Sequence, residues 1–108
     1  MNDLIKKFQE KILERLVDPH NHRKSNKIED EIHGIFKTLR EKGALSELEP
    51  LLNHENITIA NYAATYYLVV DENKAIDALK AFASRVEDPF VINHTIEQWK
   101  KGEINFDY

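Results

Sequence analysis

The chain has 108 residues, of which 42% are hydrophobic and 31% are charged, and its formal net charge is −4. This length fits one compact domain and excludes a second independent one, while the acidic balance makes duplex nucleic acid a poor partner and a basic protein a better one. The sequence contains no cysteine, which excludes disulfides, a thiol nucleophile and cysteine-based metal sites.

Apolar residues recur every three or four positions, and only three glycines and three prolines interrupt them, so we expect helices and no strands. A first helix is predicted over residues 3–17, ending at Asp18-Pro19, and its buried apolar stripe is predicted to include Leu13 and Leu16. After a polar stretch over 20–26, a second helix follows and ends at Gly43. A short third helix over 45–52 contains Pro50, and its predicted capping residues are Ser46 and Glu49.

Three more helices are predicted in the second half of the chain. The fourth covers residues 57–70 with Asn56 as its N-cap, and the fifth covers residues 73–86. Residues 87–89 open the sixth helix, which Gly102 closes, and a short tail over 103–108 follows. Four aromatic residues at helical spacing are expected to lie in the core: Tyr62, Tyr66, Tyr67 and Trp99.

The second half also contains an internal repeat. Shifting Leu48, Leu51 and Leu52 by thirty-one positions gives Leu79, Phe82 and Ala83, and such two-helix units are typical of α-solenoids. We therefore predict an all-α fold of about six helices, stacked as three helical hairpins in a short HEAT-like α-solenoid. The prediction treats residues 1–108 as a single domain, with a helix pair over 1–43, two hairpins over 44–102 and the tail over 103–108.

Two segments extend this interpretation through resemblance. The segment from Leu51 to Ala64, with paired leucines, a turn and paired alanines, resembles a HEAT-like hairpin. From Leu48 to Ile104 the chain is similar to a family of small bacterial helical domains, the domain of unknown function numbered two thousand and nineteen. The similarity rests on the helix pair, on residues 70–73 and on residues 99–102. The resemblance implies a small HEAT-like fold and a binding role, and it carries over no functional residue.

Few residues suggest catalytic chemistry. Asp18, His20 and His22 form an Asp-x-His-x-His cluster, a ligand type that zinc accepts, but we interpret it as a solvated interhelical loop. His33 follows Glu29 by four residues, which indicates an ion pair on a helix. Phosphate-binding glycine loops and the zinc-protease motif are absent from the sequence, so we predict no catalytic residue, no metal and no cofactor.

Charge is distributed unevenly along the sequence. Residues 1–43 contain ten basic and eight acidic residues, whereas residues 44–108 contain five basic and eleven acidic ones. An acidic surface can attract and hold a cationic protein, although a solvated acidic face is the simpler alternative. The predicted partner-binding residues, on the last helices and their ends, are Asn61, Thr65, Asp71, Glu72, Asn93, Glu97, Glu103 and Asp107.

These observations favour a non-enzymatic protein-binding module, most specifically an immunity protein that neutralises a basic bacterial toxin such as a nuclease. We expect a cytoplasmic protein with no nucleic-acid or membrane partner, because the sequence has no signal segment and no long apolar span. Two alternatives stay open. One is a small metal-binding protein or enzyme that uses Asp18, His20 and His22, and the other is a structural homo-oligomeric subunit.

Overall fold

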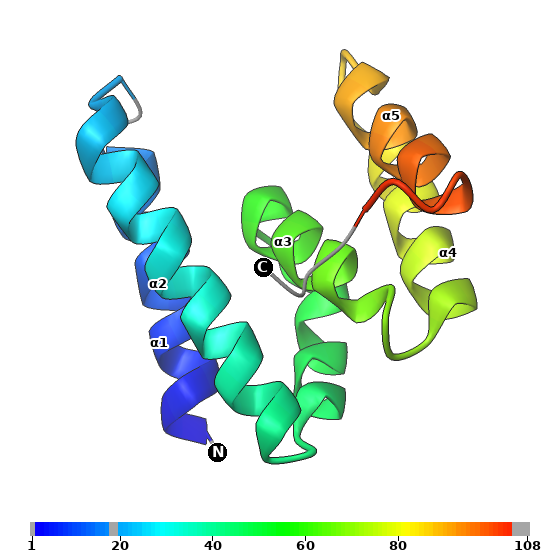
Figure 1. Cartoon of the computed structure of the whole chain (residues 1–108). Coiled ribbons are helices and arrows are strands. Elements are labelled where there is room, and N and C mark those ends of the chain that lie inside the picture. Colours follow the sequence, from blue (N-terminus) through cyan, green and yellow to red (C-terminus); the bar gives the residue numbers. More distant parts are fainter. Residues whose placement is uncertain (1, 18–19, 105–108) are drawn as a thin grey trace. The chain divides into compact units, whose positions relative to one another are not determined.

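The structure is a computed structural model that describes residues 2–17 and 20–104 (Figure 1). Five α-helices and one 3₁₀ helix make up these residues, and no strand occurs among them, which confirms the all-α prediction. The chain forms two compact units, Met1–Leu48 and Glu49–Tyr108. The stacking of helical hairpins into one solenoid stays a prediction. Within the described ranges, no helix combines the length and the apolar character needed to cross a bilayer.

The first unit is an antiparallel pair of helices, α1 (Asn2–Val17) and α2 (His22–Glu41), which run side by side in Figure 1. The buried residues at the centre of both helices are large and apolar, among them Phe8, Ile12, Ile32 and Phe36. Apolar burial of this kind supplies most of the stability of an amphipathic helix pair.

Two expectations for this unit need correction. Residues 22–26, predicted as a polar linker, belong to α2, because Asn21 is its N-cap and accepts a hydrogen bond from the Lys24 backbone N–H at 3.1 Å. Leu13 and Leu16, predicted on the buried stripe of the first helix, are exposed. At about 100° per residue, Leu13 lies to one side of the row that contains the buried Phe8 and Ile12. Leu16 follows Ile12 by four residues and continues this row, but it lies in the last turn of α1, beyond the buried positions.

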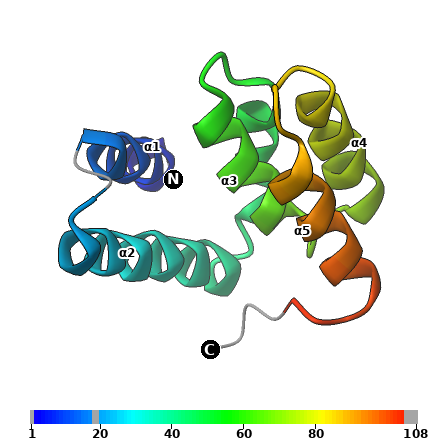
Figure 2. The ribbon, with the colours of Figure 1, turned by 90° about the horizontal axis from the view of Figure 1, so that it is seen from above.

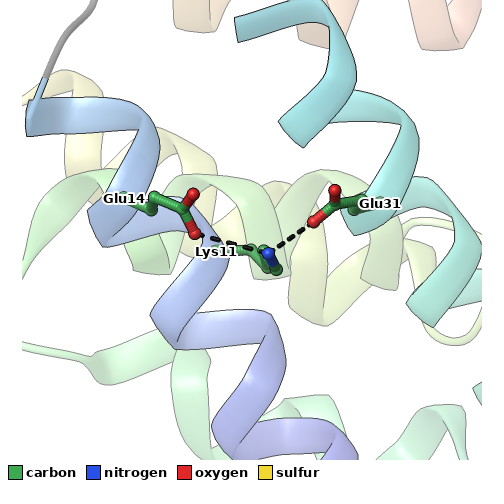
Figure 3. A network of polar contacts seen from close by, with 3 residues as sticks. All are labelled: Lys11, Glu14 and Glu31. Carbon is green, nitrogen blue, oxygen red and sulfur yellow. Dashed lines mark hydrogen bonds and ion pairs between the residues drawn. The ribbon is translucent and has the colours of Figure 1, made fainter. Parts of the chain in front are cut away.

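A polar clasp of three residues links the two helices of the first unit (Figure 3). The Lys11 ammonium group lies 2.5 Å from a Glu31 carboxylate oxygen on α2 and 3.3 Å from a Glu14 carboxylate oxygen on its own helix. The hydrogen bond from Lys11 lowers the pKa of Glu31, and the bond to Glu31 raises the pKa of Lys11. A second ion pair joins Arg15 and Glu29 at 3.0 Å, so charged groups flank the apolar contact between α1 and α2.

The 3₁₀ helix η1 (Leu45–Asn53) follows Gly43, which ends α2 in a left-handed conformation with φ of +66°. Pro50 lies inside η1, where its ring and missing N–H are incompatible with an undisturbed α-helix. With three residues per turn, a 3₁₀ helix aligns Leu45, Leu48 and Leu51 along one side, and the last two are buried. The predicted third helix is confirmed, with 3₁₀ rather than α geometry.

The second unit contains α3 (Ile57–Tyr67), α4 (Glu72–Ala83) and α5 (Phe90–Lys100), and α4 packs against both of the others (Figures 1 and 2). Asn56 caps α3 as predicted, since its side chain accepts hydrogen bonds from the Thr58 and Ile59 N–H groups. Gly102, with φ of +73°, follows the C-terminal cap of α5. Alanines at the centre of α3 and large side chains such as Leu79 and Phe82 of α4 are buried.

Two helix ends in this unit differ from prediction by three residues each. α3 ends at Tyr67 instead of residue 70, because the Asp71 side chain accepts from the Lys74 N–H and begins the next helix. α4 ends at Ala83 instead of residue 86, where the Ser84 hydroxyl donates to the Ala81 carbonyl oxygen at 2.7 Å. In both cases a short polar side chain competes with the helical backbone pattern.

Candidate functional site

The acidic excess of the chain belongs to its second unit. By sequence, Glu49–Tyr108 contains ten acidic and five basic residues, whereas Met1–Leu48 contains nine acidic and ten basic ones. The nine of these carboxylates that the structure describes differ in what they contact. Some form hydrogen bonds or ion pairs within the unit, and others are exposed and form none with the described residues.

Two predicted binding residues at the start of α4 have structural contacts. Asp71 is the N-cap of this helix. Glu72 accepts a hydrogen bond at 2.9 Å from the indole Nε1–H of Trp99, and this bond links α4 to α5. Both residues thus form contacts within the unit, and their predicted place on a binding rim stays a prediction. Glu49 likewise forms an ion pair with Lys74.

The polar residues predicted on α3 are less accessible than those on α5. Asn61 and Thr65 are half-buried, and the Thr65 hydroxyl donates to the Asn61 carbonyl oxygen at 2.8 Å. Asn93 and Glu97 on α5 are exposed. The structure shows α4 packed against each of these helices, and the side-by-side placement of the two polar pairs, which the repeat predicts, stays a prediction.

Asn93 and Glu97 line a shallow surface depression on α5, together with four residues from the start of that helix: Asp88, Pro89, Phe90 and His94. Positions 90, 93, 94 and 97 share one helix face because they are three or four residues apart. Phe90 is 68% exposed, an unusual state for a large aromatic side chain. Its ring is parallel to that of His94, with an angle of 7° and 5.7 Å between the ring centres.

Five acidic side chains of the second unit are exposed and have no hydrogen bond or ion pair to another described residue: Glu55, Asp77, Glu87, Glu97 and Glu103. Three of them, Glu87, Glu97 and Glu103, lie on α5 or close to its ends. Glu97 is on the depression itself, Glu87 precedes the helix, and Glu103 follows it. Glu97 and Glu103 were predicted binding residues, and both are accessible. The eighth predicted residue, Asp107, lies outside the described residues.

Sequence reasoning missed Phe90, Asp88 and His94, although a signal was present. The buried positions of α5 are Ile92 and Ile96, so the helical period places residue 90 on another face. Phe90 directly follows Asp88-Pro89, which begins the helix, and it does not belong to the apolar stripe. This pattern predicts an exposed aromatic side chain at the start of the helix. The prediction used the stripe to define the core and did not ask which apolar residues fell outside it.

The histidines show no arrangement typical of catalysis. His33 is buried with its ring 5.7 Å from that of Phe36, and the Nδ1 atom of His54 accepts the Asn56 backbone N–H at 2.9 Å. His20 and His22 are exposed, the first in a turn and the second at the start of α2, which corrects the prediction of a loop for both. Asp18 lies outside the described residues.

Across residues 2–17 and 20–104, no three histidine or carboxylate side chains form a group that could hold a metal ion. The predicted aromatic core is confirmed for Tyr66 and Tyr67, which are buried, whereas Tyr62 and Trp99 are half-buried. Burial, with a smaller effect from Glu49, raises the pKa of Tyr67.

Comparison of the chain with protein-family models, with curated proteins and with solved structures finds no match. The resemblance to the family of small bacterial helical domains therefore stays a prediction. Function has to be argued from the geometry and charge of the two units themselves.

Proposed function

We propose that this protein is a non-enzymatic binding module whose second unit recognises a cationic protein. The observation that carries the proposal is the group of exposed carboxylates on α5 and close to its ends, Glu87, Glu97 and Glu103, together with an exposed aromatic side chain on the same helix. Charge of one sign around an accessible apolar surface attracts an oppositely charged protein and then provides area for contact.

The carboxylates of the second unit differ in their contacts, and this difference supports the proposal. Glu49, Asp71 and Glu72 are engaged by Lys74, a helix N-terminus and Trp99, so they define the shape of the unit. The exposed carboxylates have no such structural contact among the described residues, yet they add like charge to one unit. Accumulated like charge disfavours the compact state, which is consistent with selection for something other than stability.

The specific form of the proposal is an immunity protein that masks a basic toxin domain. A nuclease must present positive charge to bind phosphate groups, and exposed carboxylates can occupy the place of those groups. The fold needs no catalytic group or cofactor for this role, since masking requires only a stable complex.

Co-expression with the protein encoded directly upstream tests this form, because immunity genes lie next to the genes of their toxins. We expect the upstream protein to arrest growth alone, the present chain to restore growth, and the two purified proteins to elute together in size-exclusion chromatography. An upstream protein that does not inhibit growth, or growth arrest that persists on co-expression without a complex, would contradict the immunity role.

A second candidate, self-association, is favoured by one observation on α1. Leu13, Leu16 and Val17 are all exposed, and their spacing places them together on one side of the helix. Such a patch can pair with a second copy. Light scattering of wild type and the Leu13→Lys/Val17→Lys variant tests this: a wild-type dimer that the variant abolishes supports self-association, and a wild-type monomer at high concentration rejects it.

A further inference from the structure

We propose, on the basis of the proposed function, that the depression on α5 is the anchor site for an arginine side chain of the cationic partner. In this arrangement the guanidinium group lies flat on the rings of Phe90 and His94, and it is paired with the carboxylates at the two ends of the depression. The site thus takes an arginine side chain, which contacts the rings of Phe90 and His94 and the flanking carboxylates.

The local sequence explains why an aromatic ring faces water at this position. Pro89 is the N-cap residue of α5, and its side chain cannot accept a capping hydrogen bond. The Asp88 carboxylate accepts one instead, from the Phe90 backbone N–H at 3.0 Å. This bond orients the first turn. Ile92 and Ile96 then occupy the buried side, and Phe90 is directed away from it.

The rings form a flat surface suited to a planar cation. Phe90 and His94 are one turn apart, with nearly parallel rings whose centres are 5.7 Å apart. This separation is typical of offset stacking and leaves no room for a third group between the rings, so a ligand must lie on their outer surface. Arginine stacks on aromatic faces, whereas the compact, strongly hydrated ammonium group of lysine does so less well.

Acidic groups bound this surface at both ends. One Asp88 oxygen accepts the hydrogen bond from the Phe90 N–H, and its second oxygen is available as an acceptor. Glu97 lies two turns along the helix from Phe90, about 10 Å at 1.5 Å per residue. A guanidinium group has five donors in a planar fork, so it can stack on the rings and bind a carboxylate at the same time.

Two positions of the second unit provide matched controls. Val91 is 66% exposed, almost as much as Phe90, but it does not line the depression. Glu55 is an exposed carboxylate just before α3, and it is also outside the depression. Substituting these residues removes apolar surface or charge of the same kind without touching the proposed site.

The test is a nuclear magnetic resonance titration of the full ¹⁵N-labelled chain with hexa-arginine peptide at about 0.15 M salt, where distant charges are screened. We expect the amides of Phe90, Asn93, His94 and Glu97 to shift most. Phe90→Ala and Glu97→Gln should each weaken binding about two- to fivefold, as loss of one cation–π or exposed ion-pair contact does, while Val91→Ala and Glu55→Gln change it by less than about 1.5-fold. Hexa-lysine should bind more weakly than hexa-arginine.

Equal binding of hexa-arginine by wild type and all four variants would overturn the anchor site and leave the proposed function in place, since other carboxylates would then bind the cation. Equal binding of the two peptides would overturn the choice of arginine. If the chain binds neither peptide and also fails to bind the upstream-encoded protein, the proposed function fails together with the anchor site. Circular dichroism of each variant checks that the helices are retained.

Discussion

Replacing Gly34 with alanine should make the protein more stable. Gly34 lies in the interior of α2 and is exposed, and apart from its chain neighbours and the backbone of its own helix, no heavy atom lies within 4 Å of the position that an added Cβ would take. Glycine in a helix interior is less favourable than alanine by about 0.8–1.0 kcal/mol. With an unfolding entropy of about 2.1 cal/mol/K per residue over the whole chain, this gain raises Tm by about 4 °C.

Thermal unfolding followed by far-ultraviolet circular dichroism measures this shift, and the other two glycines provide the control. Gly43 and Gly102 have φ values of +66° and +73°, a conformation that alanine adopts at a cost of about 1–2 kcal/mol. Alanine at either position should therefore lower Tm, although space is available there too. An unchanged or lower Tm for Gly34→Ala would refute the helical conformation or the open space assigned to this position.

Three further substitutions test packing and charge. Leu79→Ala should destabilise the fold by about 2–5 kcal/mol in urea unfolding, because this side chain is fully buried, and wild-type stability would show that α4 is misplaced. Lys11 lowers the pKa of Glu31, so this carboxylate stabilises the fold above its unfolded-state pKa of about 4.5, and the stabilisation is lost as the pH falls through its lower folded-state pKa. The Glu31→Gln variant should therefore be less stable than wild type at pH 7, and the difference in stability should disappear in acid. Burial and Glu49 raise the pKa of Tyr67, so wild type should lose stability as pH rises above about 10. Tyr67→Phe should lose less over that range, and identical alkaline slopes would contradict the assignment.

The sequence predicts helix type and helix starts well where one residue has a dominant effect. The Asn56 side chain caps the start of α3. Gly43 and Gly102 adopt the left-handed conformation that ends helices. The ends of α3 and α4, which have no glycine, were predicted three residues too late. At Tyr67 and Ala83 the apolar pattern continues, but the side chains of Asp71 and Ser84 compete for backbone groups, and periodicity does not represent that competition.

The candidate site was predicted only in part, for a related reason. Counting charges located the acidic half, and two of the residues predicted to bind a partner, Glu97 and Glu103, are exposed. It could not reveal that Glu72 is engaged by Trp99, because that bond joins residues twenty-seven positions apart on two packed helices. Phe90 was missed because a sequence argument assigns an apolar residue to the core by default, and only the face defined by Ile92 and Ile96 shows otherwise.

The central claim is that exposed carboxylates of the second unit capture a cationic protein. The most direct test is the association rate of the upstream-encoded protein, measured from low to high salt for two triple variants of equal charge change. We expect Glu87→Lys/Glu97→Lys/Glu103→Lys to slow association strongly at low salt, with the difference fading as salt screens the charges. Glu10→Lys/Asp30→Lys/Glu41→Lys, at exposed positions of the first unit, should change the rate much less. Equal rates for the two variants at every salt concentration would contradict the claim.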